Sequence, residues 1–170
     1  MPVRYIGAAI VFLSCGGFGF LKAAHFRREE RLLAELIRLL EQMQSELEFR
    51  LTPLPMICEH AAQEAAGSLK AVFSALATEL EAQVAPDASA CLQAALKRVA
   101  DLPENLQKAL TMLGNSLGRF DLQGQMNELC AVREFCASHY GRMQENRDAR
   151  LRSYQSLGLC VGAGLAILFL

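Results

Sequence analysis

Residues 25–51 read HFRREERLLAELIRLLEQMQSELEFRL and contain neither glycine nor proline. Apolar side chains recur every three or four positions, at Leu32, Leu33, Leu36, Leu40, Met43 and Leu47. Arginine and glutamate fill the opposite face. This period of about 3.6 residues predicts one long amphipathic helix that buries its apolar stripe against other helices.

Capping residues and glycine predict two further helices directly after this one. Thr52 is a favourable N-cap and Pro53 a favourable first helical residue, so a helix is expected from Pro53 to about Ala66, where Gly67 ends it. Ser68 is expected to cap the next helix, which runs to about Gln83. The long helix that contains residues 25–51 is therefore expected to run from the membrane to Thr52-Pro53.

The second half of the central region contains similar signals for the starts and ends of helices. A helix to about Ala100 is expected after Pro86-Asp87. Asp101-Leu102-Pro103-Glu104 resembles a capping box, and the helix that it opens is expected to end near Gly118. The last helix is expected to begin near Asp121. No segment alternates as a strand would, so we expect an all-α bundle of about six helices.

Both ends of the chain are apolar enough for a membrane. No charged residue lies between Arg4 and Lys22, and none follows Arg152. As helices, residues 5–21 would rise about 26 Å and residues 153–170 about 27 Å, which is marginally enough to span a bilayer. A transmembrane helix is therefore expected at each end.

The charges beside these apolar runs predict an orientation. Residues 22–31 and residues 142–152 each hold four basic and two acidic side chains. Because basic residues stay on the cytoplasmic side, both flanks place the central region in the cytoplasm. We therefore expect a membrane anchor in residues 1–24, a cytoplasmic helical bundle in residues 25–152, and a second anchor in residues 153–170.

Two alternatives for the first run stay open. The run resembles a signal peptide, for which Gly17-Phe18-Gly19 is a conceivable cleavage region. It also contains Cys15, at which an exported protein would carry a lipid. An uncleaved anchor is favoured over both.

Small residues occur at intervals of four within the terminal runs. The second run contains them at Gly158, Gly162 and Ala166, and the first contains Cys15 and Gly19. Such spacing lets transmembrane helices approach closely, although glycine is also common in these helices for other reasons. Pairing of the two anchors of one chain is a hypothesis that follows.

Charge and cysteine usage exclude some function classes. From Leu32 to Gly141 there are 8 basic and 14 acidic residues, a net charge of −6, which argues against nucleic-acid binding. The six cysteines are scattered without CxxC spacing, which favours reduced thiols over a disulfide framework.

The sequence offers no convincing catalytic constellation. There is no GxxxxGK[ST] phosphate loop. Cys58 with His60 and Cys136 with His139 are more often incidental neighbours than catalytic or metal-binding pairs. Glu46 and Glu48 are expected on a solvated helix face. We expect a protein that is not an enzyme and needs no cofactor or metal.

Two motifs are candidates for a structural role or a partner contact. The first is a corner between helices at Thr52, Pro53 and Leu54. In the second, Gly114 would allow close helix packing, Gly118 a left-handed helix end and Asp121 an N-cap. The residues of this second motif are Gly114, Leu117, Gly118, Asp121 and Gln125.

These features resemble the stage III sporulation protein AB family of endospore-forming bacteria along essentially the whole chain. The resemblance rests on the first apolar run, on Thr52-Pro53-Leu54, and on Leu-Gly-x-Ser-Leu-Gly-x-x-Asp-x-x-x-Gln in residues 113–125. Ser156-Leu157-Gly158 at the start of the last run completes it.

The resemblance implies a non-enzymatic scaffold in the mother-cell membrane around the forespore. It implies a secretion-like channel complex with a secretion-type ATPase, stage III sporulation protein AA, and ring-forming partners. The family's cytoplasmic domain is similar to the platform proteins of type II secretion and type IV pilus machines, which have a duplicated domain where this chain has one. An alternative is a membrane-tethered adaptor or regulator unrelated to transport, which gene neighbourhood would distinguish. Self-association is left open.

Overall fold

The structure is a computed structural model. It describes residues 2–50, 52–82, 87–99, 102–117 and 122–145, together with Ser156 and Cys160. Side chains are described from residue 21 onward. All statements below concern these residues.

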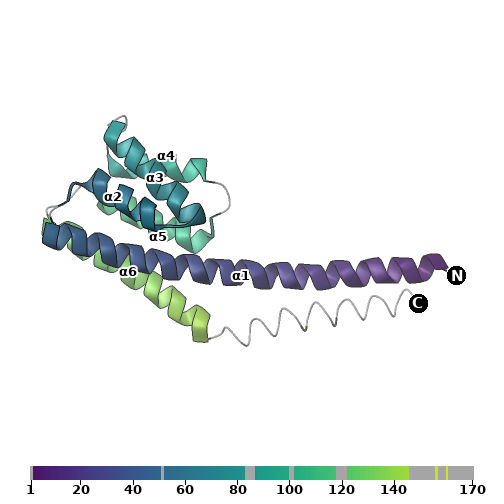
Figure 1. The fold of residues 1–170 in the computed structure, drawn as a ribbon. Coiled ribbons are helices and arrows are strands. Elements are labelled where there is room, and N and C mark those ends of the chain that lie inside the picture. Colours follow the sequence, from purple (N-terminus) through teal and green to yellow (C-terminus); the bar gives the residue numbers. More distant parts are fainter. Residues whose placement is uncertain are drawn as a thin grey trace. The chain divides into compact units, whose positions relative to one another are not determined.

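The described chain is entirely helical (Figure 1). Its helices are α1 (Pro2–Arg50), α2 (Leu54–Glu64), α3 (Gly67–Ala82), α4 (Ala88–Arg98), α5 (Glu104–Ser116) and α6 (Leu122–Glu145). No strand occurs in this part of the chain. The expected all-α fold of about six helices is therefore confirmed there. The helix expected to end near Thr52 ends at Arg50.

The chain divides into two compact units, one of residues 1–30 with 141–170, the other of residues 31–140. The second unit contains α2 to α5 and parts of α1 and α6. The predicted boundaries at residues 24 and 152 are not tested by this division and stay predictions.

Among the residues described with side chains, no helix is both long enough and apolar enough to cross a membrane. The side chains of residues 1–20 and nearly all of residues 153–170 lie outside those residues. The small residues Gly158, Gly162 and Ala166 lie outside them as well. The two expected anchors remain predictions.

In the 31–140 unit, α1 supplies the apolar stripe that its sequence predicts. Leu33, Leu36, Leu39 and Leu40 are fully buried, and Met43 is nearly so. Burying a leucine side chain contributes about 1.5–3 kcal/mol. This row therefore makes α1 a substantial part of the unit's core.

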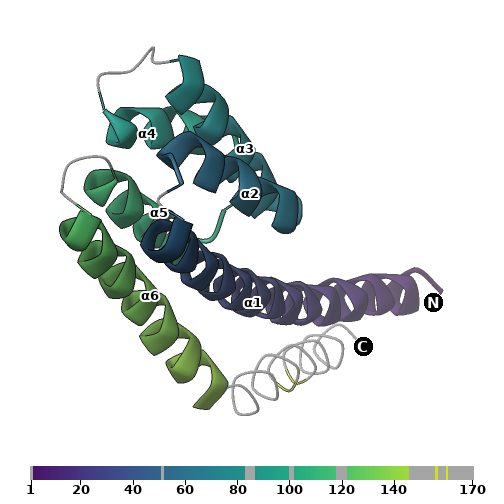
Figure 2. The same cartoon turned by 60° about the vertical axis from the view of Figure 1, so that its left-hand side comes forward.

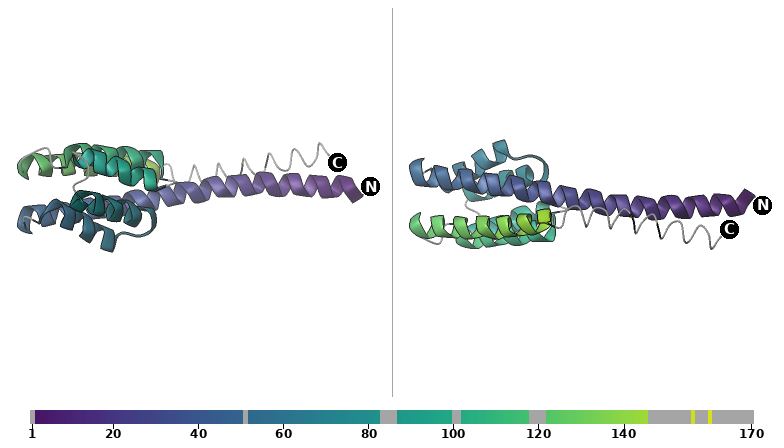
Figure 3. Two further views of the ribbon diagram at one scale, coloured as in Figure 1. Left: turned by 90° about the horizontal axis from the view of Figure 1, so that it is seen from above. Right: turned by 90° about the horizontal axis from the view of Figure 1, so that it is seen from below.

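α1 lies between α2 and α6 in this unit (Figure 2). Gln44 of α1 donates a hydrogen bond to the Cys130 sulfur of α6 at 3.0 Å, and Arg133 of α6 lies 3.6 Å from Glu41. Because these partners run in opposite order along the two helices, α1 and α6 are antiparallel. The view from below shows them side by side (Figure 3).

The helices α2 to α5 pack consecutively, each against the next. Their core is formed by Leu69, Phe73 and Leu76 of α3 with Leu92 of α4 and Leu106, Leu110 and Leu113 of α5. Arg98 of α4 pairs with Glu79 of α3 on the outside. The Asp87 side chain caps α4, because it accepts a hydrogen bond from the Ala90 amide at 2.8 Å.

Two predicted helix starts were wrong in detail. The N-cap of α2 is Pro53 and not Thr52, and that of α5 is Pro103. Both prolines have extended backbones, with ψ of 143° and 144°, and neither helix has a side-chain cap. Glu104 therefore occupies the first helical position of α5 and not the third position that a capping box requires.

The turn between α2 and α3 also differs from the expectation. α2 ends at Glu64, and Gly67 opens α3 with a φ of +51°, a left-handed conformation that glycine adopts at little cost. Ser68, expected as an N-cap, is the second residue of α3.

Candidate functional site

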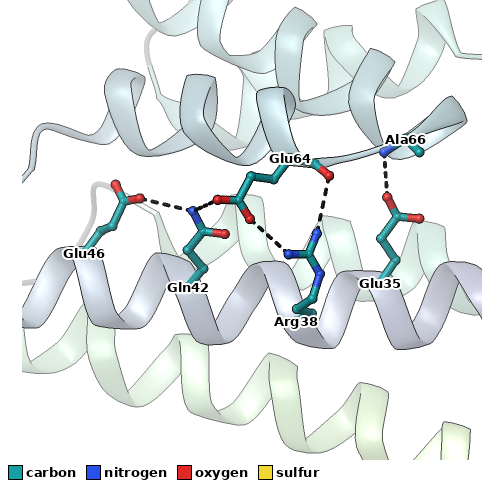
Figure 4. A network of polar contacts seen from close by, with 6 residues as sticks. All are labelled: Glu35, Arg38, Gln42, Glu46, Glu64 and Ala66. Atoms are coloured by element: carbon teal, nitrogen blue, oxygen red, sulfur yellow. Dashed lines mark hydrogen bonds and ion pairs between the residues drawn. The ribbon is translucent and has the colours of Figure 1, made fainter.

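Four polar residues of α1 form a row that faces α2 (Figure 4). They are Glu35, Arg38, Gln42 and Glu46, spaced by three or four positions, so they share one helix face beside the apolar stripe. Their polar contacts with His60, Glu64 and the Ala66 amide are here called the α1–α2 seam.

Glu64 is the centre of this seam. Its carboxylate accepts hydrogen bonds from Arg38 at 3.0 Å and from Gln42 at 2.7 Å, and its backbone carbonyl accepts a second one from Arg38 at 3.3 Å. The amide of Gln42 also reaches Glu46 at 3.3 Å. α2 is thus attached by its last residue to two successive turns of α1.

The seam also fixes the turn after α2. A carboxylate oxygen of Glu35 accepts a hydrogen bond from the Ala66 amide at 2.6 Å. Ala66 directly precedes Gly67, where the chain takes its left-handed conformation. A side chain of α1 therefore stabilises the connection between α2 and α3.

Glu46 does not lie on a solvated face, so that prediction was wrong. Its residue exposure is 8%, and its carboxylate lies 2.8 Å from Nδ1 of His60 on α2. Glu48, predicted for the same face, is exposed. The apolar packing of α1 on α2 buries Glu46, and His60 with Gln42 provides the polar partners that a buried carboxylate needs.

An open pocket of about 520 Å³ lies along the seam where α1 ends. Among its lining residues are Glu46, Phe49 and Arg50 of α1 and His60, Gln63 and Glu64 of α2. Phe49 is 78% exposed, the largest exposed fraction among the exposed large apolar residues of the described chain. We call this feature the corner pocket.

The motif at residues 52–54 lies beside this pocket in sequence. Pro53 is exposed, while Thr52 and Leu54 are half-buried. Pro53 accepts a hydrogen bond from the Ile57 amide at 3.1 Å, which closes the first turn of α2. Residues 52 and 53 thus form the corner between α1 and α2 that the sequence suggested. The contact of this motif with a partner stays a prediction.

The second motif is only partly described. Gly114 and Leu117 are buried in and after α5, and Gln125 is half-buried in α6. A Cβ added at Gly114 would lie 2.7 Å from Cδ2 and 3.0 Å from Cβ of Leu92, so α5 and α4 approach closely there. Gly118 and Asp121 lie outside the described residues.

The two cysteine–histidine pairs do not converge on a common centre. Burial raises the pKa of the Cys58 thiol to about 12 and that of Cys136 to about 11. His60 instead faces Glu46, and the ring of His139 packs on Phe135 with centroids 4.6 Å apart. In the described ranges, no three His, Cys, Asp or Glu residues gather as a metal site would require.

The fold and the seam together define an all-helical bundle, in which α1 joins α2 through polar contacts and α6 through its opposite side. The chain belongs to the stage III sporulation protein AB family, because the sequence model of that family matches residues 4–170. The family resemblance seen in the sequence is therefore confirmed, and a place in sporulation follows from it.

A solved structure named stage III sporulation protein AB has the same fold. The two are 19% identical, with a TM-score of 0.61, and the match covers 69% of this chain and 94% of that chain. At this identity the likeness shows the fold alone. No curated protein matches the chain.

The sequence analysis predicted neither the seam nor the corner pocket. The signal was present as a polar row at residues 35, 38, 42 and 46, next to the apolar stripe. Its partners on α2 become apparent only when the register of the two helices is known.

Proposed function

We propose that the chain is a non-enzymatic scaffold of the secretion-like channel complex that the mother cell needs for endospore formation. It docks a cytoplasmic secretion-type ATPase, stage III sporulation protein AA, to that complex. The observation that carries this proposal is the family match across residues 4–170. The helical fold shared with the solved family structure supports it.

The scaffold is held in the mother-cell membrane around the forespore by an anchor at each end. The uncharged residues 5–21 and 153–170 and the basic flanks beside them support this topology. The bundle then lies in the cytoplasm, where the ATPase and its nucleotide are. Reporter fusions after residues 100 and 170 of the full chain test it, with a cytoplasmic signal expected from the first and an external one from the second.

The acidic charge of the central region supports an electrostatic contribution to docking. Residues 32–141 carry a net charge of −6, which attracts a basic surface, and exposed charge pairs weaken as salt screens them.

Co-purification from sporulating cells tests the proposal. The tagged full chain is extracted from membranes in mild detergent, and the ATPase is measured in the eluate by mass spectrometry. We expect the ATPase at low salt and much less of it at high salt. Its absence at every salt concentration, with the tagged chain recovered intact, would exclude the docking role.

A further inference from the structure

Three cations of α1 follow directly after the first uncharged run, and we call them the basic collar. Lys22 and Arg27 are exposed, and Arg28 is half-buried. The buried face of the same turns is formed by Ala23, Phe26 and Glu30. These three positions are spaced by three or four residues, so they share one side of the helix and leave the collar on the remaining arc. The positive charges of the collar are therefore accessible, whereas the side chain of Glu30 is buried.

The acidic residues of this part of the chain are too few to cancel its positive charge. One compact unit consists of residues 1–30 and 141–170. Between the two uncharged runs it holds seven basic and four acidic residues, a net charge of +3. The unit of residues 31–140 holds nine basic and fourteen acidic residues, a net charge of −5. The first unit therefore attracts anions, even if each of its carboxylates pairs with a cation.

The position of the collar favours a lipid over a soluble anion. Leu21, which ends the uncharged run of residues 5–21, is 68% exposed. A single exposed leucine is ordinary, but this one lies between a long uncharged segment and a cluster of cations. α1 continues from that segment through the collar without a break, from Pro2 to Arg50. Apolar residues followed by cations match the boundary between acyl chains and headgroups.

Helix geometry brings the collar to the level of the headgroups. Arg28 lies about 10 Å beyond Leu21 along the helix axis, at a rise of about 1.5 Å per residue. The headgroup region is about 5–8 Å deep on each side of a bilayer. Side chains of a helix lean toward its N-terminus, which is the membrane end of α1 in the proposed topology. The long side chains of Arg27 and Arg28 therefore reach back toward the phosphates.

We propose that the basic collar binds the headgroups of anionic phospholipids in the cytoplasmic leaflet. A guanidinium group donates two parallel hydrogen bonds to one phosphate, and the lysine ammonium adds a further positive charge. Zwitterionic headgroups also contain a phosphate, but their ammonium groups are repelled by the collar, so lipids with a net negative charge are preferred. The inference rests on the proposed membrane topology and adds a lipid preference to it.

The experiment measures which lipids stay bound to the tagged full chain. Detergent micelles supply equal amounts of phosphatidylglycerol, which is anionic, and phosphatidylcholine, which is zwitterionic, with the same acyl chains. After a wash with detergent alone, mass spectrometry gives the ratio of the two retained lipids. The collar variant carries Lys22→Gln, Arg27→Gln and Arg28→Gln together. Its control loses the same charge at exposed positions of other helices, through Lys70→Gln, Lys97→Gln and Lys108→Gln.

A second pair of variants adds a charge and removes no cation. Ala24 is exposed on α1 between Lys22 and Arg27, so Ala24→Glu places a carboxylate among the collar cations. Ala71→Glu adds the same charge at an exposed position of α3 and is the control. If the triple collar variant melts at a lower temperature than the unchanged chain, this second pair decides.

We expect the unchanged chain to retain about fivefold more phosphatidylglycerol than phosphatidylcholine, and both collar variants to retain the two lipids about equally. Both controls should stay within about twofold of the unchanged chain. Equal retention of the two lipids by the unchanged chain overturns the inference, and so does an equal fall in variants and controls. Displacement of the bound lipid by inorganic phosphate also overturns it, because the collar would then be a site for a soluble anion.

Extraction with alkaline carbonate from vesicles of the same two lipids separates this inference from the proposed topology, because it releases proteins that are not anchored. If the chain resists extraction but retains both lipids equally, the anchors stand and the collar proposal fails. If the chain is extracted but its lipid ratio falls in both collar variants, the collar binds anionic lipid and the anchors fail.

Discussion

Gly114 shows how a residue without a side chain sets the distance between two helices. It is buried in α5, and the space that its Cβ would need is occupied by Leu92 of α4. Gly141 in α6 is a useful contrast, because nothing lies within 4 Å of a Cβ added there. The two positions therefore separate close packing from the general effect of glycine in a helix.

Gly114→Ala is expected to be less stable than Gly141→Ala by about 1–3 kcal/mol in unfolding free energy, the usual cost of overpacking. Both changes gain the same helix propensity of about 1 kcal/mol, so their difference reports the contact with Leu92. Urea unfolding of the full chain, followed by circular dichroism, measures it. Equal stabilities would mean that α4 and α5 do not approach as described.

The buried thiols should be inert in the folded chain. Cys130 is exposed, whereas the raised pKa values of about 12 for Cys58 and about 11 for Cys136 keep both neutral at pH 8. We expect iodoacetamide at about pH 8 to label Cys130 and to reach the other two only in denaturant. Peptide mass spectrometry identifies the labelled sites, and fast labelling of Cys58 without denaturant would contradict its burial.

The same thiols give a pH dependence of stability. Their ordinary pKa of 9.0 applies in the unfolded chain, so between about pH 9 and pH 11 the unfolded state loses protons that the folded state keeps. The resulting stability is fully present below pH 9 and falls as pH rises through this window. Cys58→Ala with Cys136→Ala should reduce the slope of melting temperature against pH, and an unchanged slope would contradict this assignment.

At the residue scale, packing was easier to predict than capping. A glycine between apolar residues of a helix suggests that another helix approaches closely there. At Gly114 of α5, α4 approaches in this way through Leu92. The caps at Thr52 and Asp101 were mispredicted because proline has the same φ in a helix and in an extended segment. Only ψ distinguishes the two, and both Pro53 and Pro103 have an extended ψ.

At the scale of elements, α1 organises the 31–140 unit through two different faces. Its apolar stripe is buried in the core, and its polar row joins α2 in the seam. The turn between α2 and α3 has a short loop with a left-handed glycine, and Glu35 supplies one of its hydrogen bonds. Removing that bond should therefore affect the α2–α3 connection more than removing a surface ion pair.

Glu35→Ala is expected to lower the unfolding free energy by about 1 kcal/mol, as loss of a helix-capping acceptor does. Glu41→Ala, which removes the exposed pair with Arg133, should cost no more than about 0.5 kcal/mol. Glu35→Gln keeps an acceptor oxygen and should restore part of the loss. Urea unfolding compares the three, and equal losses at residues 35 and 41 would remove the proposed role of the Ala66 contact.

The helices were predicted well because the 3.6-residue period of α1 and the breaks at Pro86 and Gly67 are local signals. The seam was not, because it depends on which turn of α2 meets Arg38 and Gln42. That register is set by side-chain packing between helices separated by an irregular corner. Sequence periodicity alone contains no such information.

At the scale of the whole molecule, the chain has an acidic helical unit and belongs to a family whose name assigns it to sporulation. The acidic charge of residues 32–141 and the basic flanks support the proposed docking and topology. The proposed docking of an ATPase is the claim on which the functional account depends, and it is open to direct measurement with purified components.

That measurement is the Kd of the full chain, held in lipid nanodiscs, for the purified stage III sporulation protein AA ATPase at about 0.05 M and about 0.5 M salt, where screening lengths differ about threefold. The docking proposal predicts specific binding at low salt that weakens steeply at high salt. A low-salt signal no greater than that of empty nanodiscs would show that the ATPase does not bind the chain, and would contradict the docking proposal.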